Sequence, residues 1–532
     1  MRKLLLISVA ALGVSAGVAD SVFAQDVEDN TGQAVSPSPG TITVRLNGRV
    51  RIFAGGVWDS DANGAVFTNV GVPAGSAVSA GTGFLQPLPY RGPGNVAGYG
   101  VAGNGFAVVA PPAGYSLQFN KQGAGTITSY MRLYPGFDGV AANGLKYGAS
   151  IEIRQDNNSG AGGGVYGPIF QQGRQRGEMY IRREWGYIGT DQLGTLRVGS
   201  TDGPTSLFMV GNFENFNDGG WNGDVPAQIA PNLQVIWPWS DVGNMYTTNK
   251  IVYLSPQFYG VDFGLSYEPN TGNDGQLAGS PGCNGSDNIN AFIPATQGIA
   301  GAGCDRLAST TTGDYTRRRN TFDLAARYRG VFGAVGLAAY GGWIGSSSVT
   351  DSTPQFTPGF NLRNQFDGLD VGVGGVAVTY AGLTVGGMGL GGRVNGSWNL
   401  TPKGAPSSTA WLAGTSYTYG PLIVGTSAFE YWTPGVSGPA GLVTVPAALG
   451  PYAQPGFSSL AGQRRERGVA AGGTYSVAPG LALFASYLFG DRQENGYNFI
   501  TSQVSTPTQP LAGANNNYVH AQLFMLGTSF TW

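Results

Sequence analysis

The sequence predicts an all-β protein: a transmembrane, antiparallel, up-and-down β-barrel of about sixteen strands with long outer loops. Short segments place apolar residues at every second position, as strands with one apolar side do. Tight turns and long loops rich in glycine, proline and asparagine join these segments alternately. After the N-terminus, no apolar run is long enough for a membrane helix, so such a chain would cross a membrane with strands.

The N-terminus predicts export. Residues 1–24 have the charged start, apolar core and small-residue cleavage site of a secretory signal peptide. An uncleaved anchor helix is the alternative interpretation of the same residues. Residues 25–40 are polar and contain two prolines, which indicates a flexible tail. No linker divides residues 41–532, so we expect a single barrel over that range.

The first alternating segment, residues 41–58, has one apolar side and one basic side. The apolar side carries Ile42, Val44, Leu46, Val50, Ile52 and Trp58. The other side carries Arg45, Asn47, Arg49 and Arg51. In a barrel the first side meets lipid and the second carries guanidinium groups into water. A half-buried strand of a soluble β-sandwich fits the same alternation.

Seven short turns and eight long loops connect the alternating segments, which predicts sixteen strands. The turns are expected at residues 135–144, 188–193, 259–261, 328–332, 380–383, 419–421 and 475–481. The loops are expected at residues 59–123, 156–176, 200–249, 268–320, 345–366, 395–409, 433–467 and 490–516. Side chains cannot fill so wide a barrel, so a water-filled channel would remain. The last segment ends on Trp532 and is expected to pair with the first strand, which removes the exposed edge.

Composition and motifs disfavour an enzyme or a nucleic-acid-binding protein. The 29 Lys and Arg residues are too closely balanced by 31 Asp and Glu residues for nucleic-acid binding. The single histidine, His520, has no nucleophile motif beside it, so we expect no catalytic role. The glycines of residues 387–392 match G-x-G-x-x-G but lie in an alternating segment, which favours a barrel strand. We expect no cofactor and no metal.

The two cysteines, Cys283 and Cys304, lie in one loop-like stretch rich in glycine, asparagine and serine. In an exported protein such a pair indicates a disulfide within the loop, which would stabilise the fold by roughly 3 kcal/mol. Two free thiols are the alternative.

Several segments resemble the general diffusion porins of Gram-negative bacteria. Residues 183–189 (REWGYIG) and 194–199 (GTLRVG) are similar to the strand, turn and strand that precede the pore-folded loop of that family. Residues 249–256 are similar to the strand after that loop. The chain departs from the family at residues 200–202, where an arginine is common, and at Trp532, where phenylalanine is commoner. The resemblance implies a 16-stranded porin of the bacterial outer membrane, a homotrimer in outer-membrane lipid.

The resemblance also implies that the third loop, residues 200–249, folds inward and constricts the pore. The carboxylates on this loop are Glu214, Asp218 and Asp224. The basic residues expected on the opposite wall are Arg45, Arg49, Arg51, Arg132, Lys146, Arg154 and Arg197. Acid facing base across a narrow aqueous gap creates a transverse field that filters ions. Rim positions or ordinary solvated positions for some of these charges are the alternative.

The leading hypothesis is therefore a porin for passive diffusion of small hydrophilic solutes and ions. A substrate-selective channel for sugars or anions is an alternative, in which Tyr130 or Tyr134 would stack on the solute. A secreted β-rich adhesin or surface-layer protein is an alternative of another class, and it predicts separable β-sandwich domains. An outer-membrane hydrolase is a third, disfavoured because His520 lacks partners.

Overall fold

The computed structural model describes the barrel strands and much of one long loop. The described residues are 38–59, 65–68, 116–119, 125–155, 179–229, 233–239, 248–270, 318–348, 366–396, 398–402, 404–435, 462–499, 503–504 and 517–532. The predicted signal peptide, residues 25–37 of the predicted tail, Cys283 and Cys304 lie outside these ranges. Those predictions therefore stay predictions.

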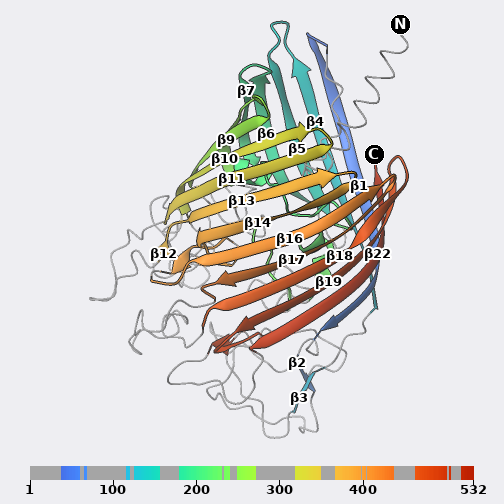
Figure 1. Cartoon of the computed structure of the whole chain (residues 1–532), viewed down its shortest axis with the longest axis vertical. Coiled ribbons are helices and arrows are strands. Elements are labelled where there is room, and N and C mark those ends of the chain that lie inside the picture. The colour runs from blue at the N-terminus through green and yellow to red at the C-terminus, as the bar shows by residue number, and fades with distance from the viewer. Residues whose placement is uncertain are drawn as a thin grey trace, which may run out of the picture.

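Sixteen antiparallel strands form one closed barrel, as the alternation predicts (Figure 1). They are β1 (Thr41–Asp59), β4 (Gly125–Val140), β5 (Lys146–Gln155), β6 (Tyr180–Thr190), β7 (Gly194–Thr201), β8 (Thr248–Leu254), β9 (Val261–Asn270), β10 (Arg318–Phe332), β11 (Val335–Ser348), β13 (Asp370–Tyr380), β14 (Leu383–Arg393), β16 (Ser408–Tyr419), β17 (Leu422–Thr433), β18 (Arg464–Ala478), β19 (Leu481–Glu494) and β22 (Tyr518–Thr531). Neighbours in sequence are neighbours in the barrel, and this single closed sheet is incompatible with an array of β-sandwich domains.

Short paired strands also occur in the long connections. They are β2 (Ala65–Thr68) with β3 (Ser116–Phe119), β12 (Phe366–Asp367) with β15 (Thr401–Pro402), and β20 (Tyr497–Asn498) with β21 (Gln503–Val504). Within the described ranges, the helical turns are α2 (Pro204–Leu207), η2 (Gly220–Asn222) and η3 (Val225–Gln228). No helix in this part of the chain is long and apolar enough to span a membrane.

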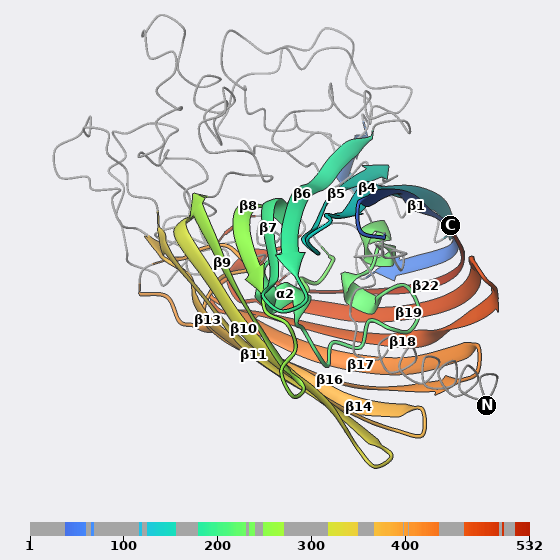
Figure 2. The same ribbon diagram turned by 90° about the horizontal axis from the view of Figure 1, so that it is seen from above.

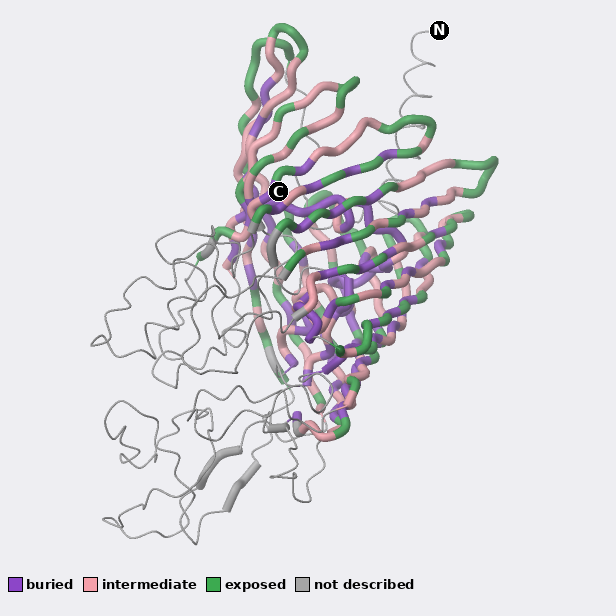
Figure 3. Tube along the Cα trace, turned by 90° about the vertical axis from the view of Figure 1, so that its left-hand side faces the viewer, coloured by how far each residue is buried: buried purple, intermediate pink, exposed green. Residues whose placement is uncertain are grey.

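The two faces of β1 are those that its sequence predicts. Ile42, Val44 and Leu46 are exposed on the outer face, whereas Arg45 and Arg49 are buried inside the barrel. Figure 3 shows the same alternation of exposed and buried positions along the other strands. Exposed tyrosines near the turns are Tyr259, Tyr380, Tyr419 and Tyr475. An apolar outer band edged by aromatic side chains is the surface that a bilayer requires.

The last strand closes the barrel against the first. Arg49 of β1 lies opposite Thr531 of β22. Trp532 and Gly48 exchange both backbone hydrogen bonds, each at 3.1 Å. Pairing between these strands removes the two free edges that an open sheet would expose.

All seven short connections are present, but several strands extend further than the turn signals predict. β4 continues through Pro135 to Val140, so its connection to β5 is residues 141–145. Pro135 has no N–H group, and the ladder with β5 is interrupted there without a change of register. β10 likewise continues to Phe332, where the sequence predicts a turn. The glycine motif of residues 387–392 lies inside β14, as a strand interpretation requires.

Candidate functional site in the barrel lumen

The connection between β7 and β8 is called the third loop here, and its described residues, 202–229 and 233–239, lie inside the barrel (Figure 2). From Pro204 to Trp221 it follows the inner wall in the order of the strands, whereas Trp237 and Trp239 return to Phe429 of β17. Near its start, Pro204 lies against Gly264 of β9. Further on, Trp221 lies against Gly490 of β19. The third loop therefore lines the barrel wall from β9 to β19. It then reaches β1 and β4, which lie beyond the seam where β22 pairs with β1.

Aromatic side chains fasten the third loop to this wall. Phe213, Phe216, Trp221, Trp237 and Trp239 are each at most 6% exposed. They share one hydrophobic cluster with inner-face residues of the wall, among them Val373, Ala377, Met388, Leu412, Phe429, Ala470, Phe484 and Leu488. Burying one such side chain contributes about 1.5–3 kcal/mol. The inner face between β13 and β19 is thus an apolar seat for the third loop.

Hydrogen bonds add fixed points along the same path. The Asn215 side-chain amide donates to Ser416 Oγ of β16 at 3.2 Å. The Thr474 hydroxyl of β18 donates to the backbone carbonyl of Asn217 at 3.1 Å. These bonds satisfy polar groups that the docked loop removes from water, so they favour one position of the loop on the wall.

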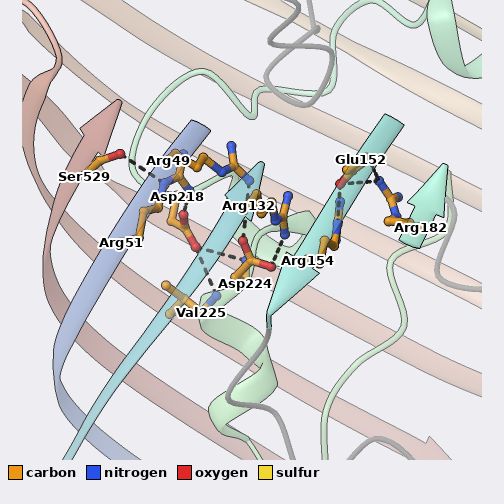
Figure 4. Close-up of polar contacts among 10 residues, drawn as sticks. All are labelled: Arg49, Arg51, Arg132, Glu152, Arg154, Arg182, Asp218, Asp224, Val225 and Ser529. Carbon is orange, nitrogen blue, oxygen red and sulfur yellow. Dashed lines mark hydrogen bonds and ion pairs between the residues drawn. The ribbon is translucent and has the colours of Figure 1, made fainter. Parts of the chain in front are cut away.

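A row of arginines crosses three strands on the other side of the seam (Figure 4). Arg49 of β1 is directly opposite Arg132 of β4, and Arg132 is directly opposite Arg154 of β5. Arg51 lies two residues further along β1 on the same face. Like charges directly opposite each other destabilise a sheet, so this row needs carboxylates nearby.

Asp218 and Asp224 of the third loop supply two of these carboxylates (Figure 4). Asp218 forms an ion pair with Arg51 and accepts the backbone N–H of Asp224 at 3.0 Å. Asp224 forms an ion pair with Arg132, and one of its oxygens lies 3.8 Å from a guanidinium nitrogen of Arg49. At these pairs acid and base are in direct contact, instead of facing each other across the aqueous gap that the sequence predicts.

The Tyr130 ring lies close to three guanidinium groups of the arginine row. Its centroid lies 5.7, 5.9 and 5.1 Å from the guanidinium carbons of Arg49, Arg51 and Arg132. Cation–π attraction at these distances holds the guanidinium groups near the ring. Tyr130 is 6% exposed and Tyr134 is 3% exposed, so neither ring has an open face on which a sugar could stack.

A second network of charges, on β5 and β6, escaped the sequence analysis. Glu152 forms ion pairs with Arg154, with Arg182 at 3.2 Å and with Arg183 at 3.3 Å. Arg183 also pairs with Asp202, at the root of the third loop, at 2.9 Å. A register shift between β5 and β6 breaks the period-two alternation at Arg182. The sequence signal for this shift is the pair Arg182 and Arg183, because a regular strand would point one of two successive arginines outward.

Lys146 lies at the turn end of the barrel, the rim position named above as the alternative. It is the first residue of β5, beside a short turn, and its ammonium group lies 2.5 Å from Asp191. Both side chains are largely exposed, at 40% and 75%. Alternation gives the face of the sheet on which a residue lies, but not its height in the barrel, so the sequence does not reveal that Lys146 lies apart from the arginine row.

The remaining predicted residues have other neighbours. Arg45 pairs with Asp138 of β4 at 2.5 Å. The guanidinium carbon of Arg197 lies 4.3 Å from the Trp185 ring centroid. Glu214 is buried within the third loop. The structure therefore brings together Arg49, Arg51, Arg132 and Arg154 with Asp218 and Asp224. It places Arg45, Lys146, Arg197 and Glu214 elsewhere.

The two ion-pair networks together carry an excess of positive charge. Their cations are Arg49, Arg51, Arg132, Arg154, Arg182 and Arg183. Their anions are Glu152, Asp202, Asp218 and Asp224. Counted over these ion pairs of the described residues, six cations minus four anions leave a net charge of +2. Fixed cationic charge on a low-dielectric wall attracts small anions and repels small cations.

Comparisons with known proteins agree with this architecture. A family model described as Gram-negative porin matches residues 8–495. No curated protein matches the chain. Among solved structures, the chain is similar to an anion-selective porin from Comamonas acidovorans (12% identity, TM-score 0.45), to the outer membrane protein OmpT of Vibrio cholerae in its trimer form (11%, 0.42) and to Salmonella typhi OmpF in complex with daunomycin (11%, 0.41). Each match covers 92% of this chain and 100%, 100% and 97% of the other chain, respectively.

Proposed function

Because this chain belongs to the Gram-negative porin family, we propose that it lets small hydrophilic solutes and ions diffuse passively across the outer membrane. The signal peptide of residues 1–24 would direct its export. The closed barrel of sixteen strands, with arginines on its inner wall, is the observation that supports this proposal. A barrel of this strand number is wide enough to hold water. Diffusion needs no cofactor or covalent step, so pore width and charge set the rate.

The proposal includes a preference for anions. The third-loop carboxylates Asp218 and Asp224 neutralise part of the arginine row but leave the net charge of +2 counted above. Small anions therefore meet an attractive wall and small cations a repulsive one. Exposed charges are screened more strongly at high salt, so the preference is expected to be greatest at low ionic strength.

Conductance and liposome swelling test the channel. We expect the purified protein to give stepwise conductance in planar bilayers, with a reversal potential on the anion-selective side in a KCl gradient. Liposome swelling with sugars of increasing size is expected to slow smoothly with solute size. Absence of conductance from correctly folded protein would refute the channel, and saturable uptake of one sugar would favour the substrate-selective alternative.

We also propose that the barrels assemble as homotrimers within outer-membrane lipid, and Glu184 supports assembly. On β6, Arg183 and Trp185 point inward, so Glu184 between them points outward. It lies opposite Ile151, and both Ile151 and Ile188 are exposed on the same apolar face. A carboxylate on a lipid-facing surface is costly. Hydrogen-bond donors from a second copy of the chain would remove that cost.

Substitution of Glu184 by leucine distinguishes a protein contact from a lipid contact. If Glu184 accepts hydrogen bonds from a neighbouring subunit, Glu184→Leu lowers the temperature at which the oligomer dissociates, as measured on native gels after heating. If Glu184 faces lipid, leucine leaves this temperature unchanged or raises it, and the assembly argument from this residue is wrong. The matched control is Ile188→Leu, an apolar exchange on the same face of β6.

A further inference from the structure

The barrel wall beneath the third loop carries glycines where the loop approaches it most closely. A Cβ atom added at Gly414 of β16 would lie 2.7 Å from the Phe213 ring. One added at Gly425 of β17 would lie within 3.0 Å of the Phe216 ring. Real Cβ atoms essentially never show such distances, so a side chain at either position requires the ring to move.

The same arrangement recurs along the path of the third loop. Further close approaches to the third loop are Gly264 of β9 to Pro204, Gly375 of β13 to the Val210 carbonyl oxygen, and Gly468 of β18 and Gly490 of β19 to Trp221. At Gly468 the Phe429 ring of the neighbouring strand is closer still. Together with Gly414 and Gly425, we call these six residues the wall glycines. Gly342 of β11 and Gly472 of β18 also approach the third loop, at Thr205 and Asn217 respectively. By contrast, a Cβ atom added at Gly391 of β14 meets nothing within 4 Å.

Strand geometry alone does not explain the wall glycines. Glycine in a strand interior weakens the strand, because it has no side chain to pack and loses more entropy on folding. Six such positions under one loop indicate that glycine is present there to leave room for the atoms of the third loop. Phe216 is fully buried, so its ring is surrounded and cannot simply rotate away from an added methyl group.

We propose that the wall glycines are positioning residues that set the aperture of the pore. They let the third loop lie directly against the wall, which leaves the largest cross-section for solutes in the rest of the lumen. A side chain at one of these positions displaces the loop toward the barrel axis and narrows the passage. The inference rests on the proposed channel function and assigns its size limit to residues that need not contact the solute.

Single-channel recording of glycine and aromatic variants tests this role. Gly425→Ala is expected to lower the conductance of each channel and to reduce the size of the largest sugar that enters liposomes. Adding Phe216→Leu to Gly425→Ala is expected to restore both values, because the smaller side chain makes room for the methyl group. Gly391→Ala is the matched control and is expected to conduct like the parent chain.

The coupling between the two sites is the deciding readout, because a folding defect changes the number of channels and not the conductance of each. Unchanged conductance of Gly425→Ala, or a double variant that does not recover, overturns the proposal. If Gly425→Ala does not insert, Gly414→Ala with and without Phe213→Leu provides the same test at the next strand. A parent chain that does not conduct refutes the channel function itself, which is a separate result.

Discussion

The double substitution Arg49→Glu/Arg182→Glu is expected to convert an anion-preferring pore into a cation-preferring one. Each exchange changes the charge by −2, so the net charge of the two networks goes from +2 to −2. At each site the existing carboxylate keeps another arginine: Asp224 keeps its ion pair with Arg132, and Glu152 keeps its ion pair with Arg154. The sign of the reversal potential in a KCl gradient, measured near 0.1 M salt where the Debye length is about 10 Å, reports the outcome.

The control for this experiment is Lys146→Glu, which makes the charge change of one of the two exchanges at the exposed turn end of β5. Exposed charges are largely screened, so the control is expected to leave the sign of the reversal potential unchanged. A double variant that keeps its anion preference, or a control that loses it, would mean that these networks do not govern ion selectivity.

Asp218→Ala is expected to release the third loop from the wall. The Asp218 side chain is fully buried, pairs with Arg51 and accepts backbone N–H groups of Asp224 and Val225. Removing one partner of a buried ion pair costs about 3–5 kcal/mol. The loss is expected to fall on the docked state of the loop, because the barrel strands keep their own pairing. Protease cleavage of the third loop in folded, reconstituted protein measures this release.

Two control variants show what causes a change in the cleavage rate. Asp218→Asn keeps an oxygen that can accept the backbone hydrogen bonds but removes the charge, so its cleavage rate is expected to lie between those of the parent and Asp218→Ala. Asp191→Ala breaks an exposed ion pair, and its effect on stability is expected to stay within about 0.5 kcal/mol. Asp218→Ala protein that resists protease as well as the parent would contradict the anchoring role of Asp218.

Much of the barrel could be predicted from local sequence, because the alternation within each strand shows which of its residues share a face. The alternation around Arg45 and Arg49 correctly assigned which side chains point inward, since successive strand residues point to opposite faces. The ends of strands were less predictable. Tyr328 and Pro135 look like turn residues, yet pairing with the neighbouring strands extends β10 and β4 past them.

The site was only partly predictable, because its geometry depends on contacts between distant segments. The roles of Asp218 and Asp224 as acidic partners of wall arginines could be anticipated, but which arginine each one meets could not. That choice follows from the path of the third loop, which residues such as Phe216 and Gly425 fix from more than 200 positions apart. Arg182 was missed because a local change of register, invisible in one strand alone, turns it inward.

The path of the third loop also has a consequence for biogenesis. Its docking contacts begin on β9, continue to β19 and finish on β1, so the complete seat exists only after the last strand has joined the first. Contacts between distant segments form late, because the chain between them must be ordered first. In a closed barrel whose third loop has not yet docked, three tryptophans that the folded chain buries, Trp221, Trp237 and Trp239, would still be in contact with water.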